Sequence, residues 1–238
     1  MNIYQVFTRL FGANVEHPVP HGSKSQNGCG TMSAFTPKAL ADIKAMGVTH
    51  IWYTGIIEHA TQTDYRRHGI TPDHPAVVKG KAGSPYAIKD YYDIDPAFGT
   101  LDDFDALVEG CHKRGIKLII DLVLNHISSQ NPLFTQAAME VVDGNLDGNA
   151  KYFEIHKKDY FSPDTQVVAL GDYACEANFS QSMPEWNLNS EATREEFTKI
   201  AKFWLDRGVD GFRLDACKFY TNKETDGEEF LEWFVKTC

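Results

Sequence analysis

One pattern of apolar and polar positions occurs three times along the chain. In each copy an amphipathic helix ends at a glycine and is followed by a strand that is almost wholly apolar. The predicted helices cover residues 36–47, 100–115 and 190–208, and the strands that follow them cover 48–53, 116–124 and 209–215. A further strand, residues 2–11, comes first. Strands that alternate with helices and are apolar on both faces indicate a parallel sheet covered by helices.

The predicted helices begin at residues that can cap them. Thr36 precedes Pro37, Thr100 precedes Asp103 by three positions, and Ser190 opens the last helix. Side-chain oxygens at such positions accept hydrogen bonds from the free N–H groups of the first turn. The glycines at which the helices end are Gly47, Gly115 and Gly208. These local signals support the helix limits.

This order of elements predicts an α/β fold of the (β/α)8 TIM-barrel type, with the first four βα units present. A doubly wound open sheet is the alternative, and it is disfavoured because no G-x-G-x-x-G turn follows the first strand. Residues 127–183 interrupt the alternation of helices and strands, since they are rich in Asp, Asn, Gly and Tyr and lack a long stripe of apolar residues at helical spacing. We therefore expect barrel segments at 1–126 and 184–238 and a small inserted domain at 127–183. Half a barrel would expose two unpaired edge strands.

Composition narrows the class of ligand. The formal net charge of -10 argues against nucleic acid, which needs clustered Lys and Arg. With 12% aromatic residues, an acidic surface fits a neutral polyhydroxy ligand, although acidity for solubility explains the charge equally well. No apolar run is long enough for a membrane span.

The N-terminus and the cysteines bear on location. The start of the chain lacks the basic and apolar regions of a secretory signal. The five cysteines are odd in number and far apart in sequence, which favours free thiols in a reducing compartment over a disulfide framework. We expect a cytoplasmic protein.

The strongest chemical signal lies at the end of the last predicted strand. Side chains alternate along a strand, so Arg213 and Asp215 should point the same way, with Leu214 opposite. An arginine favours the ionised form of a nearby carboxyl group, and a carboxylate at this end of a barrel strand is a candidate nucleophile. Lys218 follows three positions later. A structural ion pair is the alternative interpretation, and it would be preferred if this signal stood alone.

Two further groups of polar residues follow earlier strands. Asp121 interrupts an apolar strand and therefore needs a partner or a function, while Asn125 and His126 lie where that strand ends. Tyr86 opens a tyrosine-rich segment after the second strand, and aromatic rings at a barrel mouth can stack on sugar rings. Structural roles, such as a turn-capping Asp, a solvent-exposed His or a packed tyrosine cluster, are the alternatives for each residue alone.

Four motifs in this order resemble those of the α-amylase superfamily, glycoside hydrolase family 13. They are YYDIDPAFGT at 91–100, DLVLNH at 121–126, MPEWN at 183–187 and GFRLDACK at 211–218. The resemblance covers essentially the whole chain. It implies a retaining glycosidase, possessing a carboxylate that attacks the anomeric carbon and a second carboxylic acid that protonates the leaving oxygen.

Matched position by position, the resemblance implies that Asp215 is the catalytic nucleophile and Arg213 its charge partner. The other matched residues are Tyr86, Asp121 and His126, which would line the sugar site, Lys218, which would contact the glucan further along, and Asn125, which matches a calcium ligand of some amylases. The expected partner is an oligosaccharide or α-glucan, the expected cofactor is calcium, and the oligomeric state is left open.

The chain departs from the family pattern in instructive ways. Glu185 replaces the Asp of the family's P-D-L-N motif, and Phe219 stands where many amylases have His. The family's acid is a Glu after the fifth strand, whereas this chain ends at Cys238. We therefore expect these 238 residues alone to be inactive. A transglycosidase or isomerase acting on α-glucosides, or a non-catalytic sugar-binding fragment, remain alternatives to a hydrolase.

Overall fold

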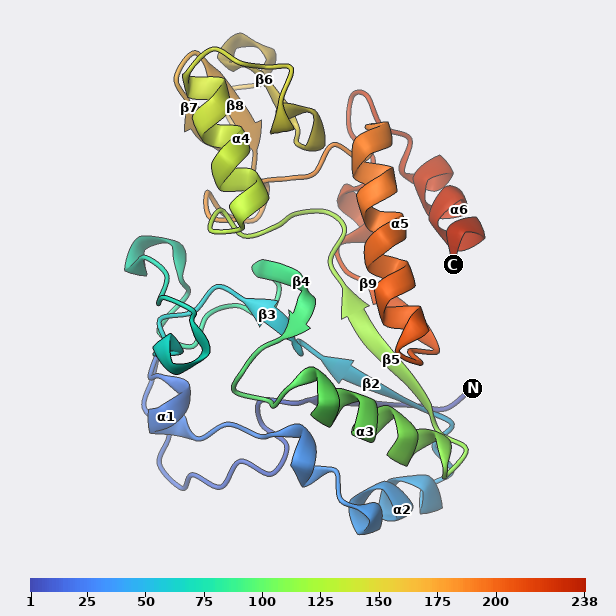
Figure 1. Cartoon of the computed structure of the whole chain (residues 1–238). Coiled ribbons are helices and arrows are strands. Elements are labelled where there is room, and N and C mark those ends of the chain that lie inside the picture. The colour runs from blue at the N-terminus through green and yellow to red at the C-terminus, as the bar shows by residue number, and fades with distance from the viewer. The chain divides into compact units, whose positions relative to one another are not determined.

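The computed structural model describes residues 1–238, and Figure 1 shows the order of its elements. The chain divides into two compact units. Unit 1 comprises Met1–Pro85, Asp90–Leu122 and Phe203–Arg213, and unit 2 comprises Tyr86–Lys89, Val123–Lys202 and Leu214–Cys238. The chain thus leaves unit 1 and returns to it twice, so each unit is built from segments that lie far apart in sequence.

The main sheet has the strand order β1-β2-β5-β9. Its strands are β1 (Ile3–Phe7), β2 (His50–Thr54), β5 (Lys117–Leu122) and β9 (Gly211–Leu214). β1 pairs with β2 and β2 pairs with β5, both in parallel. In the second pair Ile51 lies opposite Leu118, and both side chains are fully buried. Apolar residues on the central strands therefore exclude water from the sheet, as the sequence pattern predicts.

Three helices follow the strands in the predicted positions, namely α2 (Pro37–Ala45), α3 (Leu101–His112) and α5 (Glu191–Asp206). The Thr36 side chain accepts from the Ala39 N–H, and Thr100 and Asp103 form the expected reciprocal capping pair. Gly115, with φ of 61°, adopts the left-handed conformation that glycine allows at a helix end. Capping and glycine signals thus set these helix limits.

The segment between β5 and α5 contains a helix that the sequence pattern did not predict. Helix α4 (Pro132–Val142) is capped by the Asn131 side chain and buries Phe134, Ala137 and Val141. It was missed because the Asp-, Asn- and Gly-rich composition of the whole segment 127–183 indicated irregular structure. The antiparallel sheet β6-β8-β7 follows, formed by β6 (Ile155–Lys157), β7 (Val167–Leu170) and β8 (Tyr173–Glu176).

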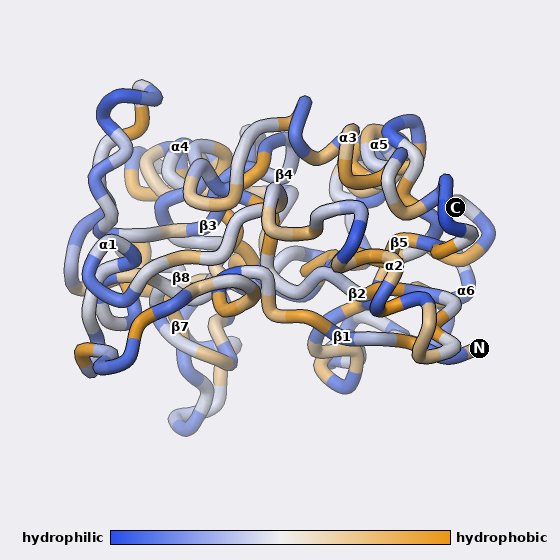
Figure 2. The backbone as a smooth tube through the Cα atoms, turned by 90° about the horizontal axis from the view of Figure 1, so that it is seen from below, coloured by the Kyte–Doolittle hydropathy of each residue, from blue (hydrophilic) through white to orange (hydrophobic).

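The remaining elements are short or terminal. They are α1 (Lys24–Asn27), the two-stranded sheet of β3 (Ile57–His59) and β4 (Ile88–Ile94), and α6 (Gly227–Thr237). Figure 2 shows hydrophobic stretches near β2 and β5 and hydrophilic colour in many loops. None of the helices combines the length and the apolar character that a bilayer crossing requires. All five cysteines are free thiols.

A buried group of charged residues lies in unit 1. Lys24 Nζ lies 2.7 Å from Asp95 Oδ2, and the Tyr65 hydroxyl donates to Asp95 Oδ1 over 2.6 Å. His59 Nδ1 is 3.2 Å from the same carboxylate, and Arg9 Nη2 is 2.9 Å from His59 Nε2. Because a guanidinium can only donate, His59 Nε2 accepts and Nδ1 carries the proton. Burial, together with the nearby positive charges, lowers the pKa of His59 to about 4.

His59 should make the stability of the protein depend on pH within a defined window. Its pKa falls from 6.5 to about 4 on folding, so only the unfolded chain binds this proton between those values. The free energy of unfolding should therefore decrease by up to about 3 kcal/mol as the pH falls through this window. His59 should add no pH dependence above it. Urea unfolding at closely spaced pH values measures the effect.

The variant His59→Gln provides the control. It should be less stable than the parent at neutral pH, because packing and hydrogen bonds are disturbed, but it should lose less stability on acidification. Parallel pH profiles for the two proteins would show that His59 is not the titrating group.

Candidate active site

Asp121 holds together the ends of three strands in unit 1. It lies on β5 with a side chain only 6% exposed. Gly55, just after β2, donates its N–H to Asp121 Oδ2 over 3.2 Å, and Arg213 on β9 donates from Nη1 to Oδ1 over 3.3 Å. The Arg213 guanidinium lies 5.0 Å from the centre of the Trp52 ring, on β2. The polar residue that interrupts β5 thus has one hydrogen-bond partner on β9 and another directly after β2.

A second group of candidate residues lies in unit 2. His126 is only 1% exposed, and its ring centre lies 4.8 Å from that of Phe179. Burial lowers the pKa of His126 to about 4, although the Asp215 carboxylate and a hydrogen bond with the Tyr86 backbone oppose the shift. At neutral pH His126 is therefore an uncharged imidazole near a carboxylate. The structure brings His126, Asp215 and the Tyr86 backbone together.

The backbone around Asp215 is held in an unusual turn. Asp215 lies one residue beyond β9 and is half-buried. The Tyr220 hydroxyl donates to the Asp215 carbonyl over 2.9 Å, and Tyr220 is fully buried. Ala216 has a φ of 57°, a left-handed conformation that costs a non-glycine residue about 1–2 kcal/mol. Such strain is common at functional sites, because the surrounding structure must maintain it.

The motif at 183–187 pairs with the segment after β5. The Trp186 N–H donates to the Asn125 carbonyl over 3.0 Å, and the Ile127 N–H donates to the Pro184 carbonyl over 3.0 Å. Between these bonds, His126 and Glu185 form an antiparallel bridge. Two of the sequence motifs therefore lie side by side, although some 60 residues separate them in the chain.

Glu185 is a carboxyl group buried next to Asn125. It is 4% exposed and accepts hydrogen bonds from the Asn178 N–H and from the Asn125 side chain. Burial, with repulsion from Glu176, raises the pKa of Glu185 to about 7. Asn125 and Glu185 together offer oxygen atoms of the kind that a hard cation binds.

Lys218 extends the unit 2 group toward solvent. It is exposed, and its Nζ lies 4.6 Å from the centre of the Phe219 ring. Phe219 packs edge-on against Phe179, with ring centres 4.8 Å apart, and Phe179 is 43% exposed. Phe179 in turn contacts His126. These residues form a partly exposed aromatic strip that ends at a positive charge.

Several residues of the site carry no clear signal in the sequence. Phe179 lies in an irregular segment after β8, Tyr220 lies beyond the last motif, and Ala216 occupies a left-handed position where glycine is usual. An aromatic residue two positions after Lys218 could have drawn attention to Tyr220. Its hydrogen bond to the Asp215 carbonyl depends on the fold, and no periodicity in the sequence indicates it.

Comparisons with known proteins agree with these observations. The family model "Alpha amylase, catalytic domain" matches residues 18–232. "Alpha-amylase 3" of Dictyoglomus thermophilum is 38% identical over 153 residues, which are 63% of this chain and 28% of that protein. A "Probable alpha-glucosidase" of Rhizobium meliloti is 29% identical over 228 residues, 92% of this chain and 35% of that protein.

A solved structure supports the same fold. The structure of Eubacterium rectale Amy13B has a TM-score of 0.75 and 32% identity, and the match covers 99% of this chain and 41% of that one. The chain therefore spans well under half the length of these relatives. The resemblance and the α/β barrel-type fold predicted from the sequence are confirmed.

The variant Asp121→Asn tests how much the charge of this residue contributes. The amide can still accept from the Gly55 N–H, but it removes the negative charge that Asp121 places beside Arg213. We expect the free energy of unfolding to fall by about 1–2 kcal/mol, a value reduced because the Arg213 side chain is 36% exposed. Urea unfolding at pH 7 measures it. An exposed pair in the same unit, Lys38 and Asp42, provides the control, since Asp42→Asn should change stability by less than about 0.5 kcal/mol.

Proposed function

The chain belongs to the alpha-amylase catalytic-domain family, and from that premise we propose that it carries the nucleophile of a retaining enzyme that cleaves α-glucosidic bonds in starch or maltooligosaccharides. The membership itself supports glycosidase activity. The observation that carries the finer proposal is the grouping in unit 2 of Asp215, neutral His126 and the Tyr86 backbone. A carboxylate beside an uncharged hydrogen-bonding group suits attack on a neutral sugar.

In the proposed reaction Asp215 attacks the anomeric carbon. A bond forms between a carboxylate oxygen and that carbon, the bond to the glycosidic oxygen breaks, and a carboxylic acid gives its proton to the leaving oxygen. Water then hydrolyses the glycosyl–enzyme ester and restores the acid. We propose that this acid lies outside the 238 residues, which cover only a part of the relatives' length.

The remaining residues are proposed to bind the sugar. Neutral His126 uses its single N–H in the hydrogen bond with the Tyr86 backbone, so its other ring nitrogen can accept a hydrogen bond from a sugar hydroxyl without placing a positive charge beside the nucleophile. Tyr86 offers a ring on which a sugar face can stack, and Lys218 is proposed to contact the glucan further along. Asp121 and Arg213, which pair in unit 1, are proposed as a sugar-binding residue and the charge partner on the strength of the motif match.

We propose calcium as the ion for Asn125 and Glu185. Both residues are buried, and a turn of the Asn125 amide that now donates to Glu185 would bring its oxygen beside the carboxylate. Ca²⁺ prefers oxygen ligands of this kind, and backbone carbonyls and water would complete its coordination. The raised pKa of Glu185 fits this assignment, since a buried carboxyl group without a cation favours its neutral form. The ion would stabilise the pairing of residues 125–127 with 184–186 and would take no part in bond cleavage.

The variant Asp215→Asn tests the nucleophile in the protein that also carries the acid. An amide cannot form the glycosyl–enzyme ester, so kcat on a chromogenic maltooligosaccharide should fall by about 10³-fold or more. The control is Asp226→Asn, at the cap of α6, where asparagine caps equally well. Substantial activity in Asp215→Asn would show that another residue is the nucleophile.

Product analysis of the same reaction separates the candidate activities. Release of free reducing sugar by water identifies a hydrolase, whereas transfer to a sugar acceptor or isomerisation identifies a transglycosidase on the same framework. Maltooligosaccharide binding with no turnover in the complete protein would identify a sugar-binding protein and overturn the proposal.

Calcium should stabilise the protein through Glu185. At about tenfold excess over Kd we expect the melting temperature to rise by about 3–5 °C, because only the folded chain presents both ligands. In Glu185→Gln this rise should disappear, while Glu228→Gln, at an exposed position on α6, should keep it. An unchanged melting temperature of the parent protein on addition of calcium would contradict the proposed calcium site.

A further inference from the structure

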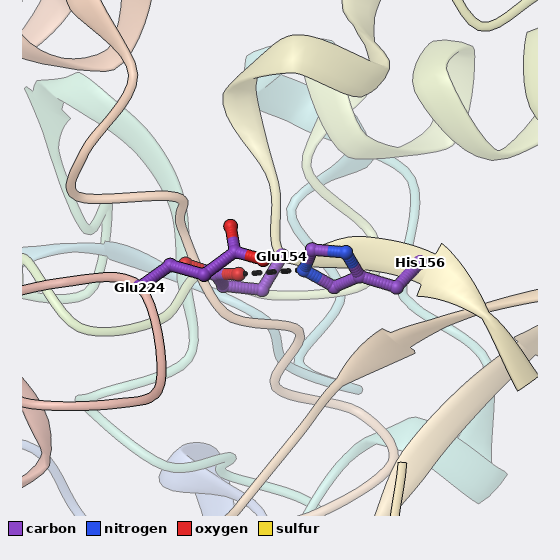
Figure 3. A group of neighbouring side chains, drawn as sticks. All are labelled: Glu154, His156 and Glu224. Atoms are coloured by element: carbon purple, nitrogen blue, oxygen red, sulfur yellow. Dashed lines mark hydrogen bonds and ion pairs between the residues drawn. The ribbon is translucent and has the colours of Figure 1, made fainter. Parts of the chain in front are cut away.

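Unit 2 contains a second group of side chains that could hold a metal ion. Glu154 directly precedes β6, His156 lies in β6, and Glu224 lies in the loop before α6. One ligand atom from each residue lies within 4.8 Å of the others. Figure 3 shows the three side chains converging, with Glu154 and His156 joined by a hydrogen bond. None of these residues belongs to the motifs that define the family resemblance.

Glu154 and His156 are fixed before any ion binds. They are two positions apart in extended chain, so their side chains project on the same side. His156 Nε2 lies 3.1 Å from Glu154 Oε2, and Asn222 donates to the other carboxylate oxygen over 3.0 Å. The His156 ring stacks on Tyr160 with centres 3.9 Å apart and planes 16° apart. Hydrogen bonding and stacking thus orient an imidazole and a carboxylate toward one point.

Glu224 projects from a loop whose backbone is held in place. Asn222 Oδ1 accepts from the N–H groups of Glu224 and Thr225 over 2.9 and 2.8 Å. The Glu224 side chain is exposed and accepts a hydrogen bond from the Tyr160 hydroxyl over 3.2 Å. A fixed backbone with an exposed carboxylate allows a small side-chain rotation to bring the third ligand onto an ion.

The charge of the site favours a cation. Glu154 is only 2% exposed, and the side chains that donate to it are an amide and an imidazole, neither of which is a permanent cation. Glu176 adds a further negative charge that acts on Glu154. A carboxylate removed from water is costly unless it is paired with positive charge. A divalent ion at this point would supply that charge.

We propose that Glu154, His156 and Glu224 bind one divalent transition-metal ion of the Zn²⁺ type, with water as the fourth ligand. An imidazole nitrogen with carboxylate oxygens suits Zn²⁺, whereas Ca²⁺ and Mg²⁺ prefer oxygen ligands alone. Ligand atoms about 2.1 Å from a tetrahedral ion lie about 3.4 Å apart. The His156–Glu154 separation of 3.1 Å is already close to this value.

The ion would link two segments of unit 2 that are distant in sequence. It would join the start of β6 to the loop at 221–226, which follows the segment carrying Asp215 and Lys218. Its role would be to hold this loop in place, and it would not touch the substrate. The inference stands on the three ligands and does not depend on the proposed glycosidase function.

Zinc binding to the metal-free protein tests the proposal. After removal of metals with a chelator, ZnCl₂ should raise the melting temperature by about 5 °C or more at a hundredfold excess over Kd. Glu224→Gln and His156→Gln should each weaken zinc binding at least tenfold in equilibrium dialysis. Glu224 is exposed, so its variant should fold even if substitutions of buried Glu154 do not.

A matched control comes from another histidine–carboxylate pair. His112 Nε2 lies 2.7 Å from Asp210 Oδ2 in unit 1, with one carboxylate instead of two, so His112→Gln should bind zinc like the parent. Glu185→Gln should also keep zinc binding, because it belongs to the calcium proposal. Unchanged affinity in both Glu224→Gln and His156→Gln would overturn the inference, as would a site that binds Ca²⁺ in preference to Zn²⁺.

Discussion

The arrangement of the strand ends in unit 1 depends on the hydrogen bonds that the buried carboxylate of Asp121 accepts. A charge inside an apolar sheet is costly unless partners surround it, and here the partners are Gly55, directly after β2, and Arg213 on β9, the strands on either side of β5. The guanidinium of Arg213 is also held against the ring of Trp52. A shift of one strand by a residue would break these contacts, so the same group that interrupts the apolar pattern also fixes its register.

In unit 2, backbone hydrogen bonds hold together two segments that are distant in sequence. Residues 125–127 and 184–186 pair through main-chain bonds, and this pairing buries His126 and Glu185. Burial then determines their charge, because it favours the neutral imidazole and raises the pKa of the carboxyl group. The hydrogen-bonding character of His126 beside Asp215 thus follows from where the chain pairs. The strained Ala216 and the Tyr220 bond show that the Asp215 backbone is likewise held by its surroundings.

The parts of the molecule that the sequence predicts are those determined by interactions between residues close together in the chain. Thr36, Thr100 and Gly115 mark helix ends because capping and left-handed geometry involve only nearby residues. The apolar composition of the strands likewise indicates that they are buried. The motifs identified the neighbourhood of His126 and Asp215 through family resemblance. Helix α4 was missed because it lies in a segment whose overall Asp-, Asn- and Gly-rich composition indicated irregular structure. Tyr220 and the cluster around Glu154 were missed because their contacts join residues that are far apart in sequence or lie in irregular segments.

The two cation sites proposed in unit 2 both contain a buried carboxyl group, but they differ in the other atoms that would bind the ion. Asn125 and Glu185 would bind through an amide oxygen and a carboxylate oxygen, which matches a hard ion such as Ca²⁺. His156 places a nitrogen beside Glu154, and that nitrogen favours a transition metal over Ca²⁺ at similar charge. Glu176 exerts its negative charge on both Glu154 and Glu185, so each of these buried carboxyl groups carries an electrostatic cost that a cation bound to it would lower. The two proposed sites share no ligand, so a substitution at one leaves the ligands of the other in place.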